Sequence, residues 1–138
     1  MIAYLDSSVI LRVVLGERGR LAGWHTVTVG ITSALAEVEC LRTLDRLRLR
    51  HDLAPETIAD RRAAVFRLLE AMEVVEIAAP VLSRASQPFP TLLGSLDAIH
   101  LATALLRRER MQQDLVMATH DIALSVAARS LGFTVLGS

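Results

Sequence analysis

The sequence contains no lysine, and all 15 of its basic residues are arginine. A phosphate-binding P-loop and a Schiff-base site each need a lysine, so both kinds of site are excluded. The same absence argues against a receiver-type phosphoacceptor domain. Cys40 is the one cysteine, which excludes an internal disulfide and a zinc site built from several cysteines. The dinucleotide-binding pattern G-x-G-x-x-G is absent as well.

The sequence also lacks a charge excess and long apolar runs. Its 15 acidic residues balance its basic ones, so it lacks the strongly basic character typical of nucleic-acid-binding proteins, although a local arginine face stays open. No apolar run approaches the roughly 18 residues of a membrane span. The apolar N-terminal run has no basic region before it and stops at Asp6, unlike a signal peptide. We therefore expect a cytoplasmic protein without membrane contact.

Length and hydrophobicity point to one folded domain over residues 1–138. The chain has 138 residues, of which 52% are hydrophobic and 22% charged. A chain of this size buries roughly two-thirds of its unfolded surface, which suffices for a core without disulfides. This composition is not that of a disordered segment.

Short apolar segments alternate with longer amphipathic segments along the chain. We predict strands at residues 2–5, 27–31, 74–77, 115–118 and 133–136. We predict helices at residues 7–15, 33–50, 55–72, 80–86, 95–108 and 121–131. Ser95 is expected to be an N-cap, and Gly132 to follow the last helix. Continuously apolar strands are typical of a mainly parallel sheet covered on both faces, so the predicted fold is a three-layer α/β/α sandwich.

Acidic residues fall where ligands bind in such folds, beyond the carboxyl ends of the strands. Asp6 directly follows the first strand, and Asp121 follows the fourth after two residues. Glu39 lies on the helix after the second strand, and Asp97 lies in the first turn of its helix. Helix-dipole stabilisation is an ordinary alternative for Asp97 and Asp121 taken singly, as a solvated helix face is for Glu39.

Four carboxylates in one crevice repel one another and raise one another's pKa. A divalent cation relieves that repulsion, and a set of oxygen ligands suits Mg²⁺ or Mn²⁺. Such an ion among carboxylates suits phosphoryl chemistry. Whether one ion or two bind is left open by the sequence.

Four short motifs occur in a characteristic order along nearly the whole chain. They are L-D-S-S-V-I at 5–10, S-A-L-A-E-V-E at 33–39, L-D-A-I-H-L-A-T-A at 96–104, and T-H-D at 119–121 with A-A-R-S-L-G-F at 127–133. Together they resemble the PIN-domain family, and within it the VapC-type toxins of bacterial toxin–antitoxin pairs.

The resemblance implies a metal-dependent endoribonuclease. Its Mg²⁺ or Mn²⁺ ligands are expected to be Asp6, Glu39, Asp97 and Asp121. A metal-activated water would hydrolyse RNA and leave 5′-phosphate and 3′-hydroxyl ends. The resemblance also implies that the hydroxyls of Ser8 and Thr119 orient Asp6 and the metal cluster. The expected partners are an RNA substrate, a second copy in a homodimer, and a VapB-type antitoxin through which the complex binds operator DNA.

Arginines follow Glu39 along the same helix. Arg42 and Arg46, with Arg50 one turn further, are candidate contacts for RNA phosphates that lead away from the metal. The alternative is a solvated helix face, which Asp45 would partly neutralise.

Other residues near the motifs have several interpretations. His100 is expected to be a hydrogen-bonded helix residue, with a general base or a metal ligand as the alternatives. His120 is expected to face solvent, or else to contact substrate. Trp24 is expected to pack, rather than to stack on a base or fill an interface, and Cys40 to be a small buried side chain.

The alternative to an enzyme is a PIN-like fold kept as a noncatalytic module that binds RNA or protein. The complete set of four acids favours the enzyme, because a scaffold has no need for clustered carboxylates. The apolar helices at 7–15 and 33–72 are consistent with an additional protein–protein surface. The segment 17–28 departs from the family pattern in being short and carrying Trp24, which leaves the rim of the site undefined.

Overall fold

A sheet of five parallel strands, in the order β3-β2-β1-β4-β5, forms the centre of the molecule. The structure is a computed structural model and describes residues 1–16 and 21–137. The strands are β1 (Ile2–Leu5), β2 (Val29–Ser33), β3 (Glu73–Val75), β4 (Val116–Ala118) and β5 (Val135–Leu136). Tyr4 of β1 pairs with Ile31 on one side and Met117 on the other, so β1 is the central strand.

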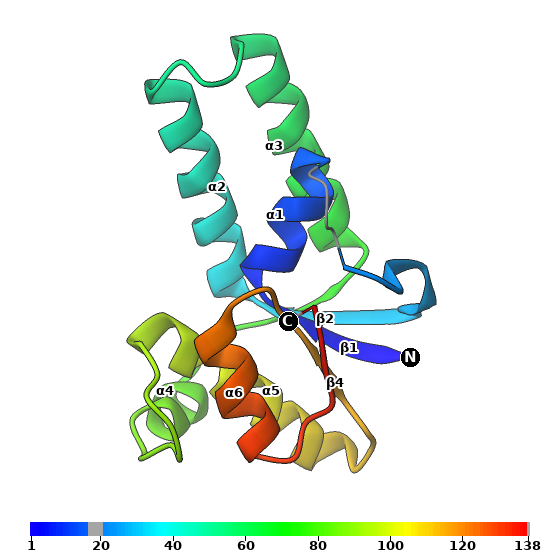
Figure 1. Cartoon of the computed structure of the whole chain (residues 1–138), viewed down its shortest axis with the longest axis vertical. Coiled ribbons are helices and arrows are strands. Elements are labelled where there is room, and N and C mark those ends of the chain that lie inside the picture. Colours follow the sequence, from blue (N-terminus) through cyan, green and yellow to red (C-terminus); the bar gives the residue numbers. More distant parts are fainter. Residues whose placement is uncertain (17–20, 138) are drawn as a thin grey trace.

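Helices cover the sheet on both sides, as Figure 1 shows. They are α1 (Ser7–Leu15), α2 (Ala34–Leu49), α3 (Pro55–Glu70), α4 (Ala79–Ala85), α5 (Ser95–Met111) and α6 (Ile122–Ser130), with a short 3₁₀ helix η1 (Trp24–Thr26). The first three lie on one side of the sheet and the last three on the other (Figure 1). The predicted three-layer sandwich is therefore confirmed. None of these helices is both long and apolar enough to cross a bilayer over the residues described.

Alternation along β1 divides the core into two clusters. Ala3 and Leu5 belong to the cluster that includes α1, α2 and α3. Tyr4 belongs to the other cluster, with Leu101 of α5 and Leu124 of α6. Successive side chains of a strand point to opposite faces, so this short strand anchors both outer layers.

Polar side chains cap the helices that follow three of the strands. The side chains of Asp6, Ser33 and Asp121 accept hydrogen bonds from backbone N–H groups in the first turns of α1, α2 and α6. Such caps satisfy donors that have no partner inside the helix. Two of the four acids of interest are therefore held at the edge of the sheet by their own helices.

Two local predictions are wrong. The second strand begins at Val29 rather than at 27, because its pairing with β1 sets its position. The strand also continues beyond the predicted end at residue 31, to Ser33. The added residues Thr32 and Ser33 are polar but fully buried, and the Thr32 hydroxyl donates a hydrogen bond to the Leu5 carbonyl. The N-cap of α5 is Gly94, and Ser95 is already helical.

The other element ends differ from the predicted ends by three residues at most. Gly132 follows α6 with a φ of 86°, as expected for a residue just beyond a helix. Of the segment 17–28, residues 17–20 lie outside the described part of the chain.

Candidate active site

Asp6 is the most firmly held of the candidate residues. Its carboxylate is 3% exposed at the end of β1. Oδ1 accepts hydrogen bonds from the Ser8 hydroxyl at 2.5 Å and the Val9 amide at 3.2 Å, and Oδ2 accepts one from the Thr119 hydroxyl at 2.5 Å. Three donors compensate for the burial of the charge and fix the orientation of both oxygens.

The same two hydroxyls connect Asp6 to the loop after β4. Thr119 Oγ1 accepts a hydrogen bond from the Asp121 amide at 2.9 Å, and Ser8 Oγ accepts one from the His120 amide at 2.9 Å. Asp121 in turn accepts a bond from the Leu124 amide at 2.8 Å. Ser8 and Thr119 thus lie against Asp6, where the sequence predicts them, and they link the first and fourth strands.

Glu39 reaches the site from α2 and is bound by a buried histidine. His100 Nε2 lies 2.5 Å from Glu39 Oε1, and His100 Nδ1 lies 2.7 Å from the Tyr4 hydroxyl. The His100 side chain is 1% exposed and the Glu39 side chain 22% exposed. His100 is therefore a hydrogen-bonded helix residue, in agreement with the favoured interpretation.

The negative charges of the other three acids reach Asp97. Burial of this half-buried carboxyl, followed by the negative charge of Asp121, raises its pKa from 3.8 to about 6. Asp6 and Glu39 add to the rise, whereas His100 opposes it. The charges of residues from four separate motifs thus act on one side chain.

Buried neighbours are affected by the same charges. Burial raises the pKa of the Cys40 thiol to about 12, and the charges of Glu39 and Asp6 contribute. The thiol is therefore uncharged and fully buried, as predicted for a small core side chain. Its place next to Glu39 gives it no metal-binding role in this state.

The chemistry of the donors suits a hard divalent cation. Carboxylate oxygens that raise one another's proton affinity also favour a cation that neutralises them. Within the residues described, no three His, Cys, Asp or Glu side chains are arranged so that they could hold a metal ion as they stand. Glu39 is turned to His100, and Asp6 and Asp121 cap helices. The residues present therefore fit Mg²⁺ or Mn²⁺ by type and by mutual charge.

A groove of about 350 Å³ runs from Glu39 along α2, and Arg42 and Arg46 line it. Arg42 is exposed and pairs with Asp45 at 3.1 Å, while Arg46 donates to the Thr43 hydroxyl at 3.2 Å. Both arginines thus line the same surface groove as Glu39. The Asp45 contact predicted for a solvated face is also present, so both interpretations of these arginines remain in place.

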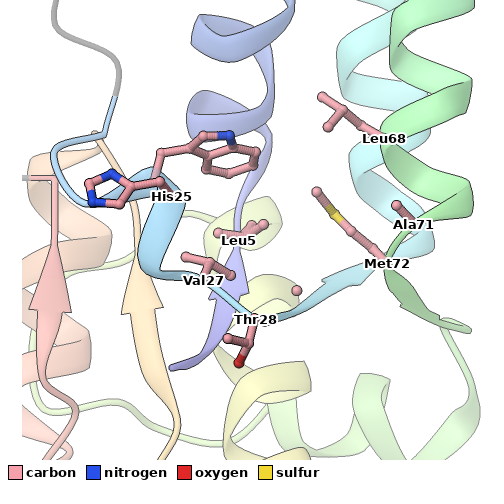
Figure 2. A pocket seen from close by; sticks show the side chains of 9 residues that line it. Leu5, His25, Val27, Thr28, Leu68, Ala71 and Met72 are labelled. Carbon is pink, nitrogen blue, oxygen red and sulfur yellow. The ribbon is translucent and has the colours of Figure 1, made fainter.

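Trp24 and His120 have mainly structural surroundings. Trp24 packs against the core cluster of α1–α3, as predicted. It also lines an apolar hollow of about 310 Å³, shown in Figure 2, whose described lining contains no acidic residue. His120 is only partly exposed, and its Nδ1 lies 3.0 Å from the Gly137 carbonyl. The prediction that His120 faces solvent is therefore wrong, because the imidazole folds against the end of β5.

Two residues near the site were not singled out by the sequence. Tyr4 occupies a buried strand position that periodicity marks only as core. Gly137 packs on Thr119, and a Cβ atom added to it would lie 2.4 Å from the Thr119 carbonyl oxygen. Tyr4 contacts His100, 96 residues further along the chain, and Gly137 contacts Thr119 on another segment. No local sequence pattern indicates either contact.

Gly137→Ala is expected to destabilise the protein and to disturb Thr119. The added Cβ would collide with backbone, and the φ of 102° at this position is one that L-residues rarely adopt. We expect a loss of about 1–3 kcal/mol in the free energy of unfolding, measured with urea. Gly16→Ala is the matched control, since its φ is also positive but nothing lies within 4 Å. Equal losses in the two variants would contradict a specific contact at Thr119.

The raised pKa of Asp97 predicts a pH-dependent stability in metal-free protein. Between pH 3.8 and about 6 the folded state retains a proton that the unfolded chain has lost. This contribution to stability is therefore present at low pH and is lost as the pH rises through about 6. Asp97→Asn should remove it, so the variant should have the higher unfolding temperature at pH 7 in EDTA. The difference between variant and wild type should shrink towards pH 4.

Asp114→Asn, at an exposed acid outside the site, serves as the control for this measurement. Its unfolding temperature should follow that of the wild type across the same pH range. Parallel curves for wild type and Asp97→Asn would show that Asp97 is not under the influence of the other acids.

Comparison with known proteins identifies the family of this chain. The PIN domain family model matches residues 3–129. The ribonuclease VapC46 of Mycobacterium tuberculosis is 32% identical over 140 residues, which cover 96% of this chain and 95% of that protein. Two solved structures share the fold with a TM-score of 0.61: VapC20 of Mycobacterium tuberculosis, a toxin that cleaves the sarcin–ricin loop, and VapBC2 of Rickettsia felis bound to a promoter DNA fragment.

Sequence identity to those two structures is 18% and 9%, so they support the fold alone. The alignments cover 96% of this chain and of VapC20, and 98% of this chain and 97% of the Rickettsia chain. The family match and the VapC46 relationship cover nearly the whole chain and include all four acids between residues 3 and 129. The chain therefore belongs to the PIN-domain family and, within it, to the VapC ribonucleases.

Proposed function

We propose that this chain is a metal-dependent endoribonuclease toxin. Asp6, Glu39, Asp97 and Asp121 would hold Mg²⁺ or Mn²⁺, and RNA phosphodiester bonds would be hydrolysed to leave 5′-phosphate and 3′-hydroxyl ends. The observation that carries the proposal is the buried Asp6 carboxylate, which three donors orient and which Thr119 links to Asp121. The negative charges of these acids and of Glu39 also contribute to the raised pKa of Asp97. Membership of the VapC ribonucleases supports the reaction class.

The acidic residues of such a site would have different roles. Asp6 is a fixed anchor, because three hydrogen bonds orient its oxygens. Among the hydrogen bonds described, none involves the Asp97 carboxylate. Because its pKa is raised to about 6, binding of a cation near that pH would release a proton from it. When bound, the divalent ion supplies activation of water and neutralisation of charge on the phosphoryl oxygens. Asp121 would complete the ligand set from beyond the carboxyl end of the neighbouring parallel strand β4.

The groove beside Glu39 supports an RNA path along α2. Arg42 and Arg46 line this groove, and their guanidinium groups can form paired hydrogen bonds with phosphate oxygens. The net charge of zero means that RNA attraction must come from such a local set of arginines. The acids repel RNA phosphates unless a cation neutralises them.

An antitoxin is the partner that the site and the relatives support. Val38, Leu96 and Ile122 each adjoin one of the four acids in sequence and are 56%, 52% and 76% exposed. Exposed apolar side chains around a polar site are typical of a protein-binding surface. In the Rickettsia felis structure, VapBC2 is bound to a DNA fragment from its promoter. We propose that a VapB-type antitoxin covers this site and carries the DNA contact, and homodimerisation stays a prediction.

The alternative function is a noncatalytic module that binds RNA or protein. Mn²⁺- or Mg²⁺-dependent cleavage of total RNA by antitoxin-free protein separates the two functions. Glu39→Gln and Asp97→Asn should each lower cleavage by at least about 100-fold, because a lost ligand removes several kcal/mol of transition-state stabilisation. The cuts should be discrete, and EDTA should abolish them.

Glu37→Gln is the matched control, because Glu37 lies on the same helix two residues before Glu39. It should retain wild-type cleavage. Equal cleavage by all variants would indicate a contaminating nuclease or a wrongly assigned site. Absence of both cleavage and metal binding in the wild type would favour the noncatalytic module.

Substitution of the groove arginines should weaken RNA binding. In an Asp97→Asn background, which leaves RNA uncut, Arg42→Ala and Arg46→Ala should each reduce RNA affinity. Each should also lower the slope of log affinity against log salt by about 1, the amount expected for one lost phosphate contact. Arg62→Ala on α3 is the control and should change neither quantity. An unchanged slope for both groove variants would indicate a solvated helix face.

A further inference from the structure

We propose that Tyr4 and His100 are positioning residues that hold the Glu39 carboxylate in place for the metal. The inference rests on the proposed function, because it concerns the same metal site. It assigns a task to two residues that supply no ligand in that proposal. The chain of contacts runs from the Tyr4 hydroxyl through both ring nitrogens of His100 to Glu39 Oε1, at 2.7 Å and 2.5 Å.

Glu39 needs such a partner because its side chain is the longest of the four. It extends from the middle of α2, whereas Asp6 and Asp121 are shorter and are held by helix caps. Among the hydrogen bonds described, the contact with His100 is the one that restrains the Glu39 carboxylate. A long carboxylate without a partner would lose side-chain entropy on binding a cation, and this contact removes part of that loss in advance.

The direction of the hydrogen bonds follows from the groups involved. An ionised carboxylate only accepts hydrogen bonds. The Nε2–H group of His100 is therefore the donor of the hydrogen bond to Glu39. A tyrosine hydroxyl is protonated at neutral pH, so Tyr4 donates its hydrogen bond to Nδ1 at 2.7 Å. A tyrosine that remains neutral can hold the far side of the ring without adding a further negative charge.

The arrangement is rigid at both ends. Tyr4, on β1, is fully buried in the hydrophobic core, and His100, on α5, is 1% exposed. The two rings meet edge to face at 71°, with centroids 5.8 Å apart. Tyr4 and Asp6 belong to the same strand end, separated by one residue. The strand that holds Asp6 therefore also sets the position of Glu39, through His100.

Metal affinity measured without RNA tests this role. Asparagine and glutamine retain one donor each: the glutamine amide takes the place of Nε2, and the asparagine amide that of Nδ1. We expect His100→Asn to weaken Mn²⁺ binding by about tenfold, the lower end of the range for residues that orient a ligand. His100→Gln should recover most of this loss. Titration of Mn²⁺ followed by its electron paramagnetic resonance signal gives the dissociation constants.

Tyr4→Phe keeps the packing and removes only the hydroxyl. It should weaken Mn²⁺ binding in the wild-type background and have no such effect in a Glu39→Gln background. This second result is the decisive one, because a purely structural role of Tyr4 would not depend on Glu39. Ile31→Val, a fully buried neighbour of Tyr4 in the sheet, is the packing control and should leave the Mn²⁺ dissociation constant unchanged.

The outcomes separate the inference from the proposed function. A wild-type protein that binds no Mn²⁺ overturns the proposed metal site itself. A wild type that binds Mn²⁺, together with unchanged affinity in Tyr4→Phe and His100→Asn, overturns the positioning role alone. Should His100→Asn fail to fold, as shown by circular dichroism, the Tyr4→Phe pair of measurements decides the question. Equal losses by Tyr4→Phe in both backgrounds also overturn the inference.

Discussion

The buried carboxylate of Asp6 is the constraint on which the rest of the site depends. A charge that is 3% exposed must be matched by hydrogen bonds or it destabilises the fold. The donors come from the turn after β1 and from Thr119 after β4. Thr119 also binds the Asp121 amide, so satisfying Asp6 fixes the place of a second acid. Gly137 then packs against the Thr119 carbonyl, which extends the constraint to the end of the described chain.

Electrostatic repulsion is the counterpart of this rigidity. Burial, together with the charges of the cluster, raises the pKa values of Asp97, Cys40 and Tyr4, three side chains of different chemistry and location. The raised pKa of Asp97 lowers the stability of the protein without a cation at neutral pH. Such an arrangement is suited to a site that gains by binding a cation, where the same repulsion becomes attraction. Strain of this kind is expected at functional sites rather than elsewhere in a fold.

Sheet topology explains how distant motifs come together. The order β3-β2-β1-β4-β5 places the second and fourth strands on either side of the first. All strands are parallel, so their carboxyl ends meet at one edge, with the crevice next to β1. Helices α2, α5 and α6 begin at or near that edge. Motifs from residues 5, 33, 96 and 119 onward therefore converge without any unusual loop.

The sequence by itself determined the layered fold, because local signals report it, and it predicts which four acids form the site. Apolar runs mark buried strands, 3.6-residue periodicity marks helices, and Asp6 stands out as an acid at the end of an apolar run. Tertiary structure alone decided how those acids are held. The start of β2 follows from pairing with β1, and the cap of α5 is Gly94 instead of Ser95. The Tyr4–His100–Glu39 contacts join residues 96 and 61 positions apart. A hydrogen bond across such a separation depends on packing of whole elements, which no local pattern of residues encodes.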